Sequence, residues 1–310
     1  MKFGGTSVGD ATCIRRSAEI VANASRERSV AVVVSAMSGV TNRLIDAAYQ
    51  AKRGDRDAGK TLAEALHRQH FEALAMLVSN EKSRMQVQHR IEEILGEGSR
   101  LYEGTALLRE LTPRTLDSIS SLGERLCAPV VSAALCDLGV ASSAVEATEL
   151  IVTDSFHGGA EPQADATRQR SHARIGPILG AGQVPVVTGF IGATADGVLT
   201  TLGRGGSDYS ATILGAALDA EEIIIWTDVE GVLTADPRLV SEARTIPEIS
   251  YREAAELAYF GAKVLHPKTL RPVLPAGIPV WIRNSFAPEK PGTKKSPLLT
   301  AFPLGVDIET

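Results

Sequence analysis

The sequence predicts an α/β fold: a three-layer α/β/α sandwich with a mostly parallel central sheet and two lobes. Short apolar runs rich in β-branched residues alternate with longer segments whose apolar residues recur at helical spacing. Strands that alternate with helices are typical of parallel sheets covered on both faces. A division near residues 195–205 separates the expected N-terminal lobe (1–200) from the expected C-terminal lobe (201–293).

Periodicity and turn residues locate the elements of the first half of the chain. Val30 to Ser35 form a short apolar run that ends in a small polar residue, which indicates a buried strand. Thr112 and Pro113 mark a boundary between a long helical stretch and the next helix. The expected helices are 43–52, 61–110, 113–138 and 165–179, and the expected strands are 30–35, 140–145 and 184–190.

In the second half of the chain, glycine-rich loops mark the boundaries between elements more clearly than in the first half. The loop 203–206 breaks a short strand, and Ser207 and Asp208 then open a helix, because both residue types are favoured in the first turn. The expected strands are 198–202, 222–226 and 278–283, and the expected helices are 207–218, 250–260 and 264–274.

Composition excludes several classes of protein. The 310 residues carry a net charge of −5 and no stripe of basic residues, so we expect no nucleic-acid partner. No stretch approaches ~18 consecutive apolar residues, so we expect no membrane partner. The cysteines lie at no metal-ligand spacing, and we expect buried thiols in the cytoplasm. They are Cys13, Cys127 and Cys136.

Three loops rich in small residues carry the first functional signal. They span 4–7, 35–41 and 203–208, and each contains serine or threonine beside glycine. In sheets of this kind, ligands bind where strand ends meet loops and helix N-termini. Glycine lets the backbone approach an anion closely, and exposed N–H groups favour phosphate or carboxylate. Three such loops together therefore predict an anion site.

One other stretch matches a phosphate-binding pattern by letters alone. Residues 54–61 fit GxxxxGK(S/T), a pattern that works only between a buried strand and a helix. Here the preceding residues are amphipathic and helical, and Asp55 and Asp57 would place two negative charges inside the phosphate cradle. We interpret the match as chance. His67 and His70 have helical spacing without acidic or cysteine partners, and we expect surface histidines.

Taken together, the glycine loops and their neighbours resemble the signature blocks of aspartokinases, members of the amino acid kinase family. The blocks occur in the family's order and cover residues 2 to about 293. They are Lys2-Phe-Gly-Gly-Thr-Ser-Val8, Val34-Ser-Ala-Met-Ser-Gly-Val-Thr-Asn42, Gly189-Phe-Ile-Gly192, Thr201-Leu-Gly-Arg-Gly-Gly-Ser-Asp208, Trp226-Thr-Asp-Val229, Thr234-Ala-Asp-Pro-Arg238 and Phe260-Gly-Ala-Lys-Val-Leu-His-Pro267.

The resemblance implies an amino acid kinase fold whose N-terminal lobe binds L-aspartate and whose C-terminal lobe binds ATP with Mg²⁺. It implies that Lys2 stabilises the transferring phosphoryl group and that Asp208 holds Lys2 or the magnesium shell, with no separate protein metal cluster. The implied nucleotide-site residues are Lys2, Gly4, Gly5, Ser7, Thr227, Asp228, Arg238 and Lys263. The implied aspartate-site residues are Ser35, Thr41, Glu124, Phe190, Arg204 and Ser207.

The chemistry itself favours these residue types. A carboxylate is already a nucleophile at neutral pH, so catalysis depends on positioning and electrostatic stabilisation. Arg204 suits the substrate's carboxylate through its bidentate fork, and Glu124 suits the amine. Simpler interpretations stay open: Asp208 as a helix cap, Glu124 as one member of a helix-face pair, and Thr227-Asp228 as an ordinary turn.

The chain also departs from the family pattern. Leu233 stands where many relatives carry a tyrosine near the adenine, and only Met1 precedes Lys2. The tail 294–310 is too short for a folded domain, so we expect no regulatory domain. We expect a homodimer formed by the kinase lobes through helices in 61–137. The alternatives are a kinase of the same fold for another small amino acid or carboxylate, and a non-catalytic nucleotide-binding subunit.

Overall fold

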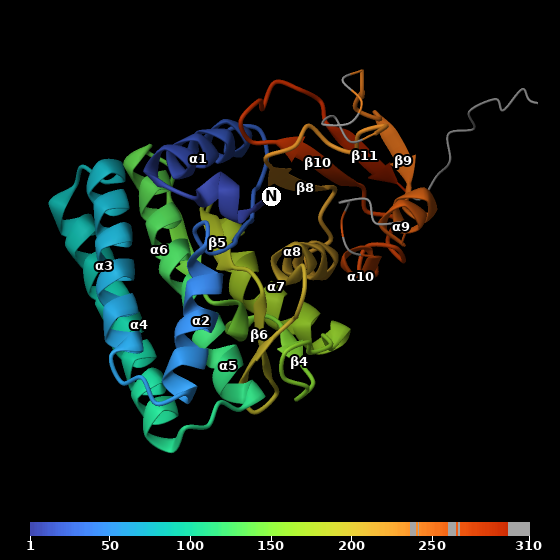
Figure 1. Cartoon of the computed structure of the whole chain (residues 1–310). Helices are drawn as coiled ribbons and strands as arrows, with labels where there is room; N and C mark the ends of the chain where they lie inside the picture. Colours follow the sequence, from blue (N-terminus) through green and yellow to red (C-terminus); the bar gives the residue numbers. More distant parts are fainter. Residues whose placement is uncertain (236–239, 241, 260–264, 266, 297–310) are drawn as a thin grey trace, which may run out of the picture.

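The structure is a computed structural model that describes residues 1–235, 240, 242–259, 265 and 267–296. A central eight-stranded sheet runs through it (Figure 1). Neighbouring strands are parallel except β10 and β11, which are antiparallel. In spatial order the strands are β3 (Ser142–Val145), β5 (Val184–Thr188), β2 (Val32–Val34), β1 (Lys2–Phe3), β8 (Ile223–Thr227), β10 (Val280–Asn284), β11 (Thr293–Ser296) and β9 (Glu248–Ser250).

Helices cover both faces of this sheet, so the predicted three-layer α/β/α architecture with a mostly parallel sheet is confirmed (Figure 1). One core cluster joins the sheet to α1 (Ala11–Ser25), α2 (Val40–Lys52), α3 (Ala58–Leu77), α4 (Glu81–Leu108), α5 (Pro113–Ser120) and α6 (Leu122–Asp137). A second cluster joins it to α7 (Ala164–Gly180), α8 (Gly206–Ala217), α9 (Tyr251–Tyr259) and α10 (Pro267–Leu270).

Strand alternation divides side chains between these two clusters. In β2, Val32 and Val34 belong to the cluster of α1–α6, and Val33 belongs to the cluster of α7–α10. This follows from the two-residue period of a strand. In β1 the same alternation places Phe3 among α1–α6 and leaves Lys2 on the face that α8 covers. The direction of the Lys2 side chain is therefore set by the sheet.

A smaller sheet and two short helical turns complete the fold. The smaller sheet has the order β4 (Val152–Thr153), β6 (Ile191–Thr194), β7 (Leu199–Thr201). The two 3₁₀ turns are η1 (Gly5–Val8), which follows β1, and η2 (Ala147–Glu149). The expected lobe boundary between residues 200 and 201 falls within β7, and both expected lobes contribute strands to the one central sheet. The division into lobes 1–200 and 201–293 stays a prediction.

Several expected elements differ in extent from the observed ones. The helical stretch 61–110 is two helices, separated by residues 78–80, and 113–138 is also two, with Ser121 between them. The expected helix 264–274 contains α10 within its described part. Strands β4, β6, β9 and β11 and helix α1 were not predicted. The expected tail 294–310 contributes its first residues to β11, and residues 297–310 lie outside the described part of the chain.

Two expectations about side-chain exposure are wrong. His70 is fully buried and Nδ1 contacts the Leu66 carbonyl oxygen at 2.8 Å, because α3 packs between α2, α4 and α6. Burial lowers the pKa of His70 to about 4. Of the cysteines, all free, Cys127 is buried as expected, but Cys13 is half-buried and Cys136 is exposed near the end of α6.

The segment Pro113–Asp137 has the length and apolar composition of a membrane span, with a mean hydropathy of 1.2. Within the protein, 89% of an apolar 18-residue stretch of this segment is buried. It comprises α5 and α6, which contact α1 to α4 and the sheet. Its apolar composition is therefore accounted for by its place in the core.

Candidate active site

Two of the three predicted glycine loops, 4–7 and 35–41, meet the residues that follow β8 at one edge of the central sheet. Strands β2, β1 and β8 are adjacent and parallel, so the residues that follow them emerge side by side. The N–H of Gly4 donates to the Trp226 carbonyl at 3.1 Å, and the N–H of Ser35 donates to the Phe3 carbonyl at 3.1 Å. The structure thus brings together segments that lie far apart in the sequence.

Lys2 and Asp208 form the charged centre of this edge. The Lys2 Nζ lies 2.5 Å from Asp208 Oδ1, and Lys2 is only 7% exposed. Asp208 lies in the first turn of α8, where the helix dipole favours a carboxylate. A β-carbon on Gly4 would lie 3.5 Å from the same Nζ, an ordinary van der Waals distance, so Gly4 lies directly beside the amine. Lysine, carboxylate and glycine backbone therefore form one compact group.

Gly5 and Ser7 serve the fold as well as the predicted site. A β-carbon on Gly5 would lie 3.2 Å from the Ala36 carbonyl oxygen, so glycine allows the first two loops to approach. Ser7 is 1% exposed, its N–H donates to Gly4, and its hydroxyl shares a 2.8 Å hydrogen bond with the Ser285 hydroxyl. Both donors of Ser7 are used inside the protein, and its predicted contact with phosphate stays a prediction.

Glu124 approaches the same centre from the first turn of α6. The helix packs closely here, because a β-carbon on Gly123 would lie 2.6 Å from that of Ala36. The Glu124 carboxyl is 4% exposed and receives hydrogen bonds from the Ala36 N–H and the Ser207 hydroxyl. Burial raises the pKa of Glu124 to about 8, although these hydrogen bonds and the charge of Lys2 oppose the rise. Glu124 Oε2 has no hydrogen-bond partner in the described protein.

Phe190 holds a strained backbone beside α8. Its φ of 71° lies in the left-handed region, which costs a non-glycine residue roughly 1–3 kcal/mol. The strain is held in place by hydrogen bonds, since the Phe190 N–H donates to the Ser210 hydroxyl at 2.9 Å and its carbonyl accepts from Leu202 at 2.9 Å. A β-carbon on Gly206 would lie 2.6 Å from the Phe190 ring. The ring therefore packs on the N-terminus of α8.

Arg204 lies on an exposed loop between β7 and α8. Gly203 and Gly205 on either side have φ of 75° and 70°, which glycine adopts without strain. The Arg204 side chain is exposed and makes no hydrogen bond or ion pair within the described residues. Its guanidinium is thus available to an anion from solvent.

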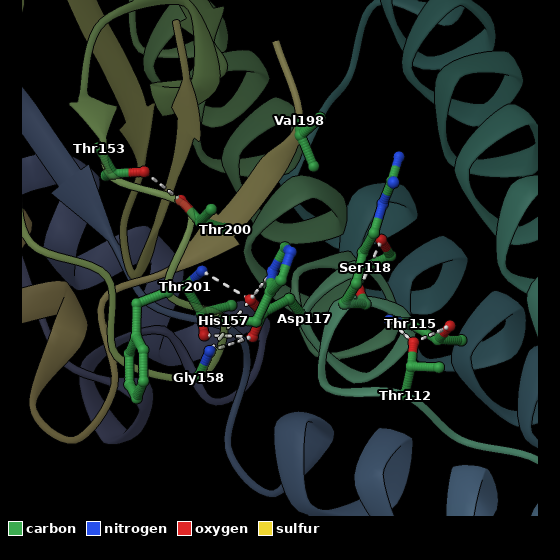
Figure 2. Close-up of polar contacts among 12 residues, drawn as sticks. Thr112, Thr115, Asp117, Ser118, Thr153, His157, Gly158, Val198, Thr200 and Thr201 are labelled. Carbon is green, nitrogen blue, oxygen red and sulfur yellow. Dashed lines mark hydrogen bonds and ion pairs between the residues drawn. The ribbon is translucent and has the colours of Figure 1, made fainter. Parts of the chain in front are cut away.

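A cluster around Asp117 positions this loop, and sequence reasoning missed it (Figure 2). The Asp117 carboxylate, 2% exposed, lies 2.8 Å from His157 Nδ1 and accepts from the Gly158 N–H at 3.1 Å and the Thr201 hydroxyl at 2.6 Å. Thr201 ends β7, two residues before Gly203, and a β-carbon on Gly203 would lie 3.0 Å from the Gly158 carbonyl. Asp117 therefore fixes both segments that support the Arg204 loop.

The predicted nucleotide-site residues are only partly described. Thr227 ends β8, and its hydroxyl donates to the exposed Asp228 carboxylate at 3.2 Å. Leu233 forms an isolated antiparallel bridge with Thr245. Arg238 and Lys263 lie outside the described residues.

The remaining predicted aspartate-site residues follow β2, begin α2 and begin α8. Ser35 directly follows β2, and Thr41 lies half-buried in the first turn of α2. Ser207 packs against Gly189, where a β-carbon would lie 2.8 Å from that of Ser207. The structure therefore gathers Ser35, Glu124 and Ser207 around the first and third glycine loops, and their ligand roles stay predictions.

Residues 54–61 lie elsewhere and in the wrong context for a phosphate loop. They connect α2 to α3, so a helix precedes them instead of a strand, as predicted. A β-carbon on Gly59 would lie 2.4 Å from the Tyr102 side chain, so this glycine serves helix packing. Lys60 is exposed on α3.

No group of three or more His, Cys, Asp or Glu able to hold a metal occurs among the described residues. This pattern is compatible with Mg²⁺, which keeps several waters and binds through one or two carboxylates plus substrate phosphates. Asp208 lies in the first turn of α8, and the exposed Asp228 directly follows β8. These two residues supply the candidate carboxylates. The donor set therefore fits a magnesium ion carried by a nucleotide.

Comparison with known proteins gives consistent matches. The sequence model of the amino acid kinase family matches residues 1–284. The chain is 38% identical to lysine-sensitive aspartokinase 3 of Escherichia coli (strain K12), over 94% of this chain and 62% of that protein. It is also 38% identical to the chloroplastic aspartokinase 1 of Arabidopsis thaliana, over 94% of this chain and 51% of that protein. The chain thus spans about half to three-fifths of these relatives.

A solved structure of E. coli aspartokinase III in complex with aspartate and ADP matches with a TM-score of 0.84 and 38% identity. The match covers 95% of this chain and 63% of that one. The same enzyme in complex with lysine and aspartate matches with a TM-score of 0.85 and 37% identity, over 96% of this chain and 64% of that one.

Proposed function

The chain belongs to the amino acid kinase family, and on that premise we propose that it phosphorylates the side-chain carboxylate of L-aspartate with ATP. The similarity to aspartokinases and to an aspartokinase structure with aspartate and ADP supports this choice of substrates. The observation that carries the proposal is the convergence of Lys2, Asp208 and Glu124 at one sheet edge, with Arg204 exposed nearby on the chain.

The reaction is a single in-line transfer. A side-chain carboxylate oxygen of aspartate attacks the γ-phosphorus of ATP while the bond to the bridging oxygen of ADP breaks. The products are 4-phospho-L-aspartate, an acyl phosphate, and ADP. The nucleophile is already ionised, so no general base is needed and the protein acts by positioning and electrostatics. Lys2 would stabilise the negative charge of the transferring group, and Asp208 would hold the Lys2 ammonium in place.

The substrate pocket combines groups of both signs. Arg204 would bind the α-carboxylate through its guanidinium fork, and Glu124, once ionised, would bind the α-ammonium group. The Ala36 N–H and the Ser207 hydroxyl contact the Glu124 carboxyl in the free protein, and its Oε2 has no hydrogen-bond partner among the described residues. Ser35, Thr41 and Phe190 would complete the walls of the pocket.

The nucleotide would bring Mg²⁺ with it, neutralising charge on its phosphates, with Asp208 or Asp228 as the protein carboxylate. Gly4 and Gly5 would allow the phosphates to approach the backbone, and Thr227, Arg238 and Lys263 would contact the nucleotide. We also propose a homodimer through the outer faces of α3 and α4, where Met76, Met85, Leu107 and Leu108 are 61–72% exposed. Cytoplasmic localisation stays a prediction.

The deciding experiment traps the product. With Mg-ATP and hydroxylamine, L-aspartate is expected to give an aspartyl hydroxamate, because hydroxylamine captures acyl phosphates. Glutamate and N-acetylglutamate should react far less. Equal reaction of another amino acid would favour a kinase of different specificity, and nucleotide binding without ADP formation on any substrate would favour a non-catalytic subunit.

A further inference from the structure

A pair of buried hydroxyl groups joins the first glycine loop to the end of a distant strand. Ser7 lies in η1, the turn that follows β1, and Ser285 directly follows β10. Both residues are buried, and their hydroxyl oxygens lie 2.8 Å apart in a shared hydrogen bond. They are 278 positions apart in the sequence, so the contact exists only because the sheet brings the two segments together.

The turn after β10 lies at the edge of the sheet that carries the glycine loop. Strands β1, β8 and β10 are parallel neighbours, so the segments that follow them emerge at one edge. Asn284, the last residue of β10, lies opposite Thr227, the last residue of β8. The Ser285 N–H donates to the Thr227 carbonyl at 2.9 Å, and the Gly4 N–H donates to the Trp226 carbonyl at 3.1 Å. Both segments are therefore fixed to the end of β8.

The hydroxyl protons of the pair allow two arrangements, and both of them end on β8. Each hydroxyl has one proton to donate. If Ser7 donates to Ser285, then Ser285 donates to the Thr227 carbonyl at 3.2 Å. If Ser285 donates to Ser7, then Ser7 donates to the Trp226 carbonyl at 3.4 Å. In either case the pair links η1, the turn after β10 and the end of β8.

The backbone of Ser7 is held as firmly as its side chain. Its N–H donates to the Gly4 carbonyl at 2.9 Å, and its carbonyl accepts a hydrogen bond of 2.7 Å from the hydroxyl of Ser17, which is buried on α1. The loop 4–7 is therefore fixed at Ser7 to α1 and to the ends of β8 and β10. Because this loop begins at Gly4, directly beside the Lys2 amine, a shift of Ser7 would change the backbone next to that amine.

We infer that Ser285 is a positioning residue for phosphoryl transfer, which acts through Ser7 to hold the loop 4–7 in place for the phosphates of a bound nucleotide. This inference rests on the proposed kinase function and extends it to a residue outside the glycine loops. Backbone donors stabilise a transferring group only when they are fixed in position beforehand. The buried hydroxyl pair restrains the loop without placing a side chain in the site.

Replacement of Ser285 by alanine tests this role against a matched control, Ser142→Ala. The Ser142 hydroxyl also shares a hydrogen bond with a second serine, Ser132, at 3.0 Å, and it donates to the carbonyl of Val184, where β5 begins, at 2.8 Å. Each variant should lower Tm by about 1–3 °C, because each removes one partner of a hydroxyl pair.

Only Ser285→Ala should change the reaction. We expect kcat to fall ~10- to 100-fold, whereas KM for aspartate should stay within about twofold of the wild-type value, because the predicted aspartate-site residues lie on other segments. MgADP binding, measured by isothermal titration calorimetry, should weaken ~3- to 10-fold in Ser285→Ala and not in Ser142→Ala.

A double-mutant cycle shows whether the two hydroxyl groups act as a unit. Ser7→Ala breaks the same hydrogen bond from the other side, so the double variant should lose little more kcat than either single variant. Ser7→Ala also replaces Ser285→Ala in the comparison if the latter does not fold. Effects on kcat that multiply, an unchanged kcat or MgADP affinity in Ser285→Ala, or an equal loss of kcat in Ser142→Ala would each overturn the inference. A wild type that binds MgADP but forms no ADP with any amino acid would instead overturn the proposed function, and the MgADP affinities would then decide the inference.

Discussion

Replacement of Glu124 by glutamine tests the assignment of the amine site most directly. The change keeps the size of the side chain and removes its charge and its titration. In the ligand-free protein burial raises the pKa of Glu124 to about 8, so the carboxyl is largely neutral at pH 7. The α-ammonium group of aspartate would favour the ionised form. Binding should therefore release a proton, and the apparent affinity for aspartate should rise with pH.

The size of the effect follows from this pKa. Ionising Glu124 at pH 7 costs about one pKa unit, or ~1.4 kcal/mol, so the apparent affinity should rise up to about tenfold per pH unit below pH 8 and then level off. Glu124→Gln should abolish this slope. At pH 8 it should weaken aspartate binding by about 2–4 kcal/mol, because the ammonium loses an ionised partner.

The stability of the free protein should fall as pH rises, whereas its affinity for aspartate should rise. The folded state raises the pKa of Glu124 above the unfolded value of about 4.5, so the wild type loses stability as pH rises from about 4.5 to about 8. The full loss is roughly 5 kcal/mol. Glu124→Gln should match the wild type near pH 5 and exceed it in Tm at pH 9.

Three measurements check this prediction: KM for aspartate from pH 6 to 9, proton release from titration heats in two buffers, and Tm across the same range. Glu103→Gln, an exposed change on α4, is the control and should behave as the wild type. A pH slope retained in Glu124→Gln, or a Tm difference that does not grow with pH, would refute the reasoning.

Further predictions concern the charge centre and its support. Lys2→Ala should lower kcat by orders of magnitude with the fold intact by circular dichroism, whereas Lys60→Ala should leave steady-state rates nearly unchanged. Arg204→Ala should raise KM for aspartate by the equivalent of ~2–4 kcal/mol without changing MgADP affinity in calorimetry. Asp117→Asn should raise KM for aspartate more than it lowers kcat, because it loosens the Arg204 loop, and His157→Gln should have a smaller effect of the same kind. If Asp117→Asn and His157→Gln lowered kcat equally, the result would contradict the role of Asp117 in positioning the Arg204 loop.

The sequence predicted elements best where one local pattern decides the structure. The apolar run 30–35 contains β2, and the small polar residues at 207–208 lie in the first turn of α8. The break between α3 and α4 was not predicted, because both helices pack against the same core and the apolar period continues across residues 61–110. The local signal was present: Asn80 caps α4 by accepting from the Ser83 N–H at 3.0 Å.

The sequence pattern indicates where the loops of the site lie, but it does not indicate which of the side chains are buried. Parallel strands end at one sheet edge, so the loops after β1, β2 and β8 could be expected to meet. Whether a polar residue is buried depends on register and on neighbours distant in sequence. Lys295 looks like one of two tail lysines until its pairing with Val280 places it inside the protein. Asp117 shows no local signal, since its partners lie 40 to 84 residues away.

The burial and the charges of the site residues indicate which ligands the site can bind, without reference to the protein's family. Lys2 and Glu124 are nearly withdrawn from water, whereas Arg204 is exposed. Each buried ionisable group weakens the free protein unless a partner compensates it, as Asp208 compensates Lys2. A polyanion would bring further negative charge to Lys2. A molecule with an ammonium and a carboxylate would compensate Glu124 and engage Arg204. A nucleotide together with an amino acid satisfies both requirements, whereas a nucleotide by itself leaves Glu124 neutral and Arg204 without a ligand.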